Sequence, residues 1–256
     1  MQTDAAIVDL DGTVYRGEDL LPGALAGIRT LRSAGVEVLF FSNNPTRTPA
    51  AYVERLAEMG IETDAEHVLT SGSVTAAYLT EHHPADDVYV VGESGLRRQL
   101  DRSPVEEPSA ADVVVGSIDR ELTYDTLTGG LRALQSAVAF YGTDPDRSIP
   151  TANDDLVPGS GAIVAALATA ADRDPTILGK PSETAANAAL ERLGVPANRC
   201  LVIGDRIDTD VAMAGEAGMR SALVLTGAHG EEDLKRFEEM PDYVLESLGA
   251  VENVLE

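Results

Sequence analysis

The first residues able to do chemistry are Asp9 and Asp11, at the end of the apolar run Ala5–Leu10. That run has the length of a β-strand, and α/β proteins bind their ligands at the carboxyl ends of such strands. If the strand continued through Asp11, both carboxylates would project from one side, and Gly12 would allow a sharp turn after them. The alternative interpretation is that both aspartates are turn residues that end a strand.

A second acidic segment could join the first. The apolar run Leu201–Ile203 leads through a glycine into Asp205, and further aspartates follow closely. Two strand-end carboxylate sites in a parallel sheet can converge on one hard cation, which prefers oxygen ligands in an octahedral array. The alternative is a helix start, in which Asp208 or Thr209 caps a helix over Asp210–Glu216. The two interpretations are compatible, since one aspartate can cap while another binds metal.

Two more segments suit phosphate. Ser42 and Asn43 follow the run Val36–Phe41 and can donate hydrogen bonds to phosphate oxygens, although a polar turn before Pro45 would use the same residues. Lys180 stands between a glycine and a proline and is one of two lysines in a chain with 17 arginines. A compact ammonium suits a phosphoryl oxygen, so we interpret Lys180 as functional rather than as a surface charge.

The elements that must position these residues alternate along the chain. Apolar runs of strand length recur at Ala5–Leu10, Val36–Phe41, Val88–Val91, Val113–Val115, Ala137–Tyr141, Leu201–Ile203 and Ala222–Leu225. Stretches with helical spacing lie between them. Continuous apolar runs favour parallel strands covered on both faces, so the pattern predicts an α/β protein with a mainly parallel sheet.

The charge of the chain is strongly one-sided. It has 43 acidic and 19 basic residues, a net charge of −24, and the acidic residues are spread along its whole length. Such a chain is repelled by phosphate backbones and by anionic lipid, which disfavours nucleic acid and membrane surfaces as partners. The composition resembles that of proteins from salt-loving microbes, where dense counterions screen the repulsion.

This charge predicts a halophilic response. Thermal stability and activity should rise with KCl into the molar range, because the Debye length falls to about 3 Å at 1 M and self-repulsion weakens. Melting curves at low and molar salt measure this. A melting temperature that does not change with salt would contradict the screening argument.

The compartment is predicted from cysteine use and the start of the chain. Cys200 is the single cysteine, so the chain has no disulfide framework and suits a reducing compartment. Met1–Asp4 lacks the basic start of a signal peptide, and the longest uncharged run, Val157–Ala171, is too short to span a bilayer. We therefore expect a soluble cytoplasmic protein.

Four ordered motifs carry a family resemblance. Read along the chain, DLDGT (Asp9–Thr13), SNN (Ser42–Asn44), GKP (Gly179–Pro181) and GDRIDTD (Gly204–Asp210) resemble those of the haloacid dehalogenase superfamily. The resemblance covers nearly the whole chain. It is strongest to the NagD-like branch, which includes sugar-phosphate, phosphoglycolate and nitrophenyl-phosphate phosphatases. It implies a phosphoric monoester hydrolase that forms a phosphoaspartyl intermediate.

The resemblance also implies roles for single residues. Asp9 would be the nucleophile that takes up the phosphoryl group, and Asp11 the general acid and base. Ser42 and Asn43 would bind the transferring phosphoryl group. Lys180 would neutralise both the nucleophile and the phosphate.

The implied cofactor is Mg²⁺. Asp9, the carbonyl of Asp11 and Asp205 would hold the ion. Asp210 would support the metal site through water or through Lys180. A divalent cation and an ammonium are what a carboxylate needs to attack a phosphate dianion against like-charge repulsion.

The implied fold is a Rossmann-like core with an inserted α/β cap. We assign residues 1–85 and 178–256 to the core and residues 86–177 to the cap, which would determine the substrate. Where the branch often carries Thr-Asn-Pro-Asp in its cap, this chain has the segment Thr143–Asp146, with Asp144 in place of asparagine. The branch's substrate specificity is therefore not carried over.

Three alternatives remain beside a phosphatase for small phosphorylated metabolites. The first is a nucleotide-sugar transferase that uses Asp9 and Asp11 as its metal-binding pair, against which Lys180 and Asp205 argue. The second is a phosphomutase or phosphotransferase with the same intermediate. The third is a non-catalytic protein that binds a phosphate ligand. The expected partner is a small phosphorylated metabolite, with a homodimer as an assembly to be tested.

Overall fold

The chain passes back and forth between two structural units. The computed structural model describes residues 3–150 and 155–255. The first unit comprises Met1–Ser42, Pro49–Leu69 and Lys180–Glu256, and the second comprises Asn43–Thr48 and Thr70–Gly179. Each unit has its own parallel sheet and its own core.

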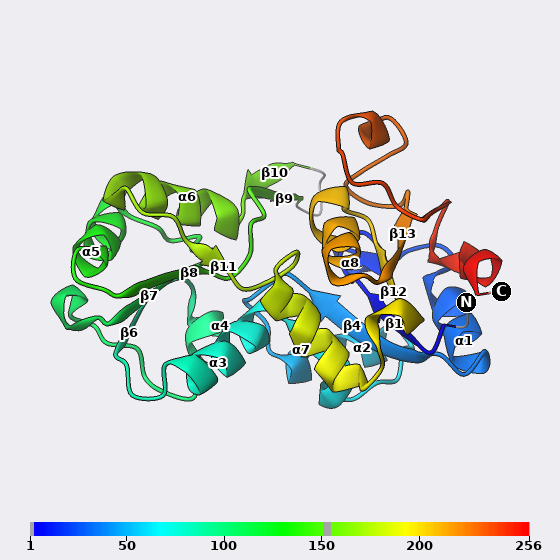
Figure 1. The fold of residues 1–256 in the computed structure, drawn as a ribbon, viewed down its shortest axis with the longest axis horizontal. Helices are drawn as coiled ribbons and strands as arrows, with labels where there is room; N and C mark the ends of the chain where they lie inside the picture. The colour runs from blue at the N-terminus through cyan, green and yellow to red at the C-terminus, as the bar shows by residue number, and fades with distance from the viewer. Residues whose placement is uncertain (1–2, 151–154, 256) are drawn as a thin grey trace. The chain divides into compact units, whose positions relative to one another are not determined.

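The sheet of the first unit has the strand order β14-β13-β12-β1-β4-β5. Its strands are β1 (Ala5–Val8), β4 (Glu37–Ser42), β5 (Val68–Thr70), β12 (Cys200–Gly204), β13 (Arg220–Val224) and β14 (Tyr243–Leu245). The strands from β14 to β4 pair in parallel (Figure 1). Val8 lies opposite both Ile203 and Phe40, so the residues that follow β1, β12 and β4 emerge at the same edge.

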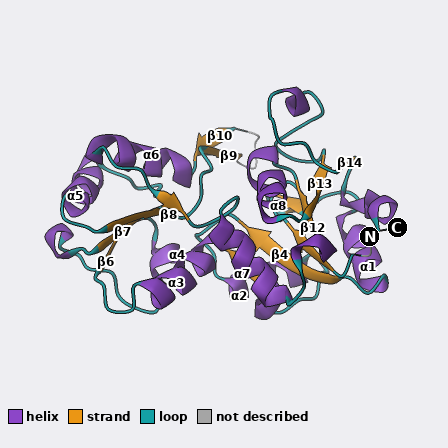
Figure 2. Ribbon diagram, viewed as in Figure 1, coloured by secondary structure: helices purple, strands orange, loops and turns teal. Residues whose placement is uncertain are grey.

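Helices cover both faces of this sheet. On one face the core joins Ala6 and Val8 of β1 to α1 (Ala24–Ser33), α2 (Pro49–Glu58) and the C-terminal 3₁₀ segment Leu248–Val254. The other face carries α7 (Glu183–Leu193) and α8 (Ala212–Ala217), which contact each other, with α7 against β4 and α8 against β13 (Figure 2). This two-sided burial explains the continuous apolar runs.

The second unit is built around the sheet β11-β8-β7-β6. Its strands are β6 (Val88–Val91), β7 (Val113–Gly116), β8 (Ala139–Gly142) and β11 (Thr176–Ile177), and all pair in parallel. The helices of this unit are α3 (Ser71–His82), α4 (Ser94–Arg97), α5 (Tyr124–Leu134) and α6 (Ser160–Ala171). Two separate apolar clusters, one with α5 and α6 and one with α3 and α4, show that both faces are covered.

Each unit also contains a short antiparallel β-hairpin. In the first unit β2 (Tyr15–Arg16) pairs antiparallel with β3 (Asp19–Leu20), just after the first acidic segment. In the second unit β9 (Ser148–Pro150) pairs antiparallel with β10 (Leu156–Pro158). Among the described residues, no helix is both long and apolar enough to cross a membrane.

The predicted α/β class with mainly parallel sheets is confirmed. One element lies elsewhere than expected, because α3 packs with the second unit and not with the core to which residues 1–85 were assigned. Leu79 of α3 is buried in one cluster with Val88 and Val113 of the second sheet. The assignment of residues 86–177 as a cap that selects the substrate remains a prediction.

Candidate active site

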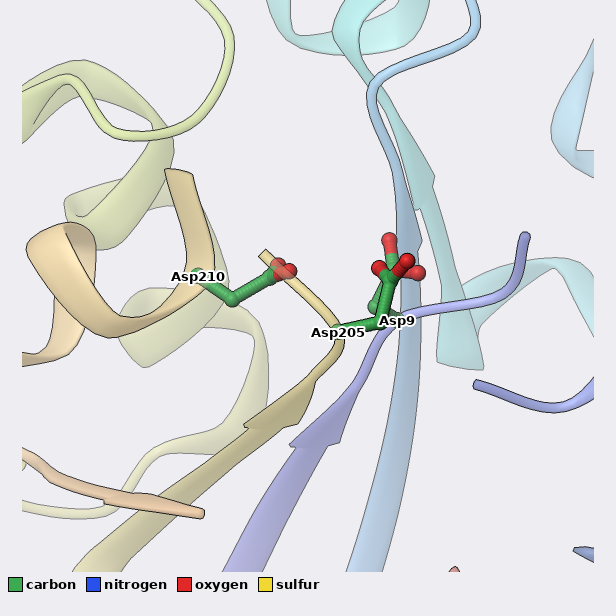
Figure 3. A group of neighbouring side chains, drawn as sticks. All are labelled: Asp9, Asp205 and Asp210. Carbon is green, nitrogen blue, oxygen red and sulfur yellow. The ribbon is translucent and has the colours of Figure 1, made fainter. Parts of the chain in front are cut away.

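Two neighbouring strands of the first unit each end in a buried aspartate. Asp9 follows β1 and Asp205 follows β12, and the Asp9 N–H donates to the carbonyl of Ile203 at 2.8 Å. Asp210 reaches the same place from the segment after β12 (Figure 3). One carboxylate oxygen from each aspartate lies within 4.8 Å of the others. The predicted convergence of the two acidic segments is therefore present.

A short π-helical turn brings Asp210 inward. This turn, Ile207–Val211, follows Arg206 and continues into α8. The Arg206 N–H donates to Asp210 Oδ2 at 3.2 Å, and the Ile207 N–H donates to the His229 Nδ1 at 2.9 Å. The alternative interpretation of Asp208 or Thr209 as a helix cap is therefore wrong, because the turn begins before both of them.

Glycines let the acidic residues pack against the backbone. A Cβ atom at Gly204 would collide with the Asp210 side chain, and one at Gly12 or at Gly227 would collide with that of Asp205. Gly12 also has a φ of +91°, a conformation that side chains strain to adopt. The glycine in DLDGT is thus needed both for the turn and for the close approach of Asp205.

Lys180 lies at the centre of this cluster and is only 1 % exposed. Its Nζ donates to Asp9 Oδ1 and to Asp210 Oδ1, each at 2.6 Å. A third bond goes to the carbonyl of Phe41 in β4, at 2.9 Å. The ammonium has three N–H groups, and these three acceptors on separate segments hold it in place.

Burial and neighbouring charges shift the pKa values of Asp9, Asp205 and Lys180. Burial raises the pKa of Asp9 well above its ordinary value, Lys180 opposes this, and Asp210 and Asp205 add to it. Burial and then Asp210 raise the pKa of Asp205 to about 7. Burial by itself would lower the pKa of Lys180, but the charges of Asp210 and Asp9 outweigh it, and the pKa is raised. The lysine is therefore held as an ammonium.

The residues present fit a divalent cation. Three carboxylates meet the ammonium of Lys180 here, so when all three are ionised their negative charges outnumber the charge of that ammonium in a buried place. The Ala228 N–H donates to Asp205 Oδ2 at 2.6 Å, whereas Asp205 Oδ1 is buried and has no hydrogen-bond partner among the described residues. Buried polar atoms are rarely left unpaired, and an all-oxygen donor set of this charge suits Mg²⁺.

Asp11 lies outside that buried group. Strand β1 ends at Val8, and the carbonyl of Leu10 accepts from the N–H groups of residues 13, 14 and 15 in a tight turn. The strand conformation therefore does not continue through Asp11, so the condition under which both carboxylates would project from one side of a strand is not met. The Asp11 side chain is exposed, and its Oδ2 accepts a hydrogen bond from the Tyr15 hydroxyl at 3.3 Å.

The two predicted phosphate ligands fall in different structural units. Ser42 ends β4 in the first unit, and its hydroxyl lies 3.2 Å from that of Tyr52. Asn43 is the first residue of the second unit, and its carbonyl accepts from the Ser71 hydroxyl at 2.6 Å. Both side chains are buried. Their action on a common phosphoryl group stays a prediction.

Comparison with known proteins now decides the family. The chain matches the family model of haloacid dehalogenase-like hydrolases over residues 6–106, and a second model of the same superfamily over residues 177–251. It is 38 % identical to the sugar-phosphatase AraL of Bacillus subtilis over 253 residues, which is 98 % of this chain and 92 % of that protein. The chain belongs to the haloacid dehalogenase-like hydrolases.

Solved structures of this superfamily have the same fold. A p-nitrophenyl phosphatase from Archaeoglobus fulgidus superposes with a TM-score of 0.93 at 32 % identity, covering 99 % of this chain and all of that one. A glycerol phosphate phosphatase from Mycobacterium tuberculosis, solved in complex with magnesium, superposes with a TM-score of 0.87 at 31 % identity, over 96 % of this chain and 75 % of that one.

These matches confirm the predicted NagD-like branch of the superfamily, since its sugar and nitrophenyl phosphatases are what the chain is similar to. The predicted enzyme class, a phosphoric monoester hydrolase, is confirmed with it. The predicted architecture of an α/β core with an inserted cap agrees with the fold of these haloacid dehalogenase-like neighbours.

Sequence reasoning missed two tyrosines beside the haloacid dehalogenase motifs. Tyr15 and Tyr52 are buried, and their hydroxyl groups reach Asp11 and Ser42 respectively. Tyr15 stands two residues after the motif DLDGT (Asp9–Thr13), so its place in the sequence is a usable signal. Tyr52 lies in α2 with the spacing of an ordinary core residue, and nothing in the sequence marks its hydroxyl.

Proposed function

We propose that this protein is a Mg²⁺-dependent phosphatase that hydrolyses small phosphomonoesters through a phosphoaspartyl intermediate on Asp9. The observation that carries the proposal is the buried contact of Lys180 with Asp9 and Asp210, beside Asp205, whose Oδ1 has no hydrogen-bond partner among the described residues. A buried ammonium between two carboxylates is costly as a structural device and is well suited to a phosphoryl group.

The first step transfers the phosphoryl group to the enzyme. An oxygen of Asp9 forms a bond to phosphorus while the bond from phosphorus to the ester oxygen breaks. Asp11 gives its proton to that leaving oxygen, so the alcohol departs neutral. Lys180 offsets charge on the nucleophile and the phosphoryl oxygens, and Ser42 and Asn43 donate hydrogen bonds to the same group.

The second step restores the enzyme. Asp11, now a carboxylate, takes a proton from water as that water attacks phosphorus. The bond between phosphorus and the Asp9 oxygen breaks, and inorganic phosphate leaves. One carboxyl group thus serves as acid and then as base, which is the advantage of splitting hydrolysis into two steps.

Asp9, Asp205 and the Asp11 carbonyl would hold the metal ion, with Asp210 supporting the site. When bound, Mg²⁺ supplies the positive charge that lets a carboxylate approach a phosphate dianion. Asp210 suits a supporting place, because Lys180 and the Arg206 N–H already bind its two oxygens. Asp205 suits a ligand, because its Oδ1 has no such partner among the described residues.

The proposed substrates are small phosphorylated metabolites, such as sugar phosphates or phosphoglycolate. This is supported by the names of the relatives and by the net charge of −24, which opposes polyanions such as nucleic acid. Residues 86–177 are proposed as the cap that selects among these substrates. We place the reaction in the cytoplasm, in keeping with a single cysteine that is buried and reduced.

Metal removal tests the proposal. After complete chelation, kcat on a panel of phosphorylated metabolites at molar salt should fall at least about 100-fold, because the carboxylates then repel the substrate. Added Mg²⁺ should restore it, and Asp205→Asn should need more Mg²⁺ for half activity. Undiminished turnover without metal would contradict the mechanism. Product analysis should find inorganic phosphate, and transfer to a sugar would show a phosphotransferase instead.

A further inference from the structure

A buried tyrosine stands directly behind the exposed carboxyl group of Asp11. Tyr15 is 1 % exposed, and its hydroxyl donates to Asp11 Oδ2 at 3.3 Å. Both residues belong to the first unit, and the contact joins positions four apart in the chain. A phenol is an O–H donor at neutral pH, so it can hold a carboxyl oxygen whether or not that group carries a proton.

Tyr15 is itself held through its ring and through its backbone. The Arg55 guanidinium of α2 lies over the ring, 4.3 Å from its centroid, and also donates to the carbonyl of Gly17. The Gly12 N–H donates to the carbonyl of Tyr15 at 2.8 Å, which closes the turn that carries Asp11. These contacts fix the position of Tyr15, so its hydroxyl can orient the carboxyl group that accepts from it.

We infer that Tyr15 is a positioning residue for Asp11, which restricts its carboxyl group to one orientation and leaves proton transfer to Oδ1. The inference rests on the proposed function, in which Asp11 is the acid and base. In the first step the proton leaves Oδ1 for the ester oxygen. In the second it returns to Oδ1 from water. Oδ2 accepts from the Tyr15 hydroxyl throughout.

The leaving group distinguishes this role from a merely structural one. The alkoxide of a sugar phosphate is a strong base and needs the proton of Asp11, while 4-nitrophenolate is a weak base and departs without it. The ratio kcat/KM reports only the steps up to phosphoryl transfer, so it isolates the acid role. Lost packing would lower kcat/KM for both substrates alike.

The decisive variant is Tyr15→Phe. We expect kcat/KM on a sugar phosphate to fall about 10- to 100-fold, since positioned acid catalysis contributes about 10²–10⁴-fold and a displaced group loses much of it. On 4-nitrophenyl phosphate the fall should stay below about threefold. Arg55→Lys keeps the charge but loses the planar group over the ring. It should lower kcat/KM less than Tyr15→Phe does, and again more on the sugar phosphate than on 4-nitrophenyl phosphate.

Two matched variants serve as controls. Tyr52→Phe removes a hydroxyl from a buried tyrosine that faces Ser42, and its effect should be equal for both substrates. Tyr243→Phe changes a half-buried tyrosine in β14, which is separated from β1 by two strands. It should leave kcat/KM unchanged on both substrates. Circular dichroism and melting curves check the folding of every variant.

Asp11→Asn separates the inference from the proposed function. If Asp11→Asn loses activity selectively on the sugar phosphate and Tyr15→Phe does not, the positioning role is overturned while the mechanism stands. If Asp11→Asn itself shows no selectivity, the acid role of Asp11 fails. The double variant should be no slower than Asp11→Asn alone, and an additive loss would also overturn the inference.

Discussion

Asp9→Asn should lower kcat by at least about 1000-fold, because an amide oxygen is too weak a nucleophile to attack phosphorus. The change keeps the size of the side chain and removes one negative charge beside Lys180, which still has Asp210 and the Phe41 carbonyl as acceptors. The buried cluster should therefore stay folded. Steady-state kinetics on a sugar phosphate, with melting curves of both proteins, measure the two effects.

The same variant also tests where the covalent bond forms. Asp9→Asn should still bind Mg²⁺ and inorganic phosphate weakly, because Asp205 and Lys180 remain. Rapid quenching of the wild type with a labelled substrate should trap a phosphorylated enzyme, and the variant should trap none. A labelled Asp9→Asn protein would show that the nucleophile lies elsewhere in the chain.

The parts of the site that follow from strand ends were predictable from the sequence. Asp9 and Asp205 each come directly after a continuous apolar run, and parallel strands bring such positions to one edge. Lys180 stood out because lysine is so rare in this chain. Its three acceptors lie directly after β1, in β4 and in the turn after β12, and no local sequence pattern shows that these segments meet.

Other features depend on tertiary packing that the sequence does not display. The turn that places Asp210 is π-helical and begins at Ile207, although the residue types suggested an ordinary helix cap one or two positions later, at Asp208 or Thr209. Helix α3 follows a strand of the first sheet yet packs on the second, because Leu79 and its neighbours fit the cluster around Val88. Periodicity identifies an apolar helix face but does not say which sheet it covers.

The hydroxyl groups of the buried tyrosines show the same limit for function. Tyr52 has the spacing of an apolar core residue in α2, and its ring is indeed in the core. What matters for the site is the one atom that reaches Ser42. The periodicity of apolar residues predicts that the ring is buried, but it does not predict which group the hydroxyl contacts.

Lys180→Arg should lower kcat about 100-fold while the protein stays folded. The ammonium fills a place that is 1 % exposed and directs three bonds at three acceptors, Asp9, Asp210 and the Phe41 carbonyl. A guanidinium carries the same charge on a longer, planar fork that cannot meet this arrangement without moving Asp9. A displacement of about 1 Å at a reacting centre can cost about 10²-fold in rate.

The control for this variant is the other lysine. Lys235 is exposed in a 3₁₀ turn of the first unit, so Lys235→Arg should leave kcat and the melting temperature unchanged. Lys180→Arg should show its loss in kcat at saturating Mg²⁺, with overpacking lowering stability by only about 1–3 kcal/mol. The chain uses arginine for nearly all of its positive charge, so retention of lysine at position 180 implies that arginine does not serve there. Equal activity of wild type and Lys180→Arg would falsify the role assigned to this residue.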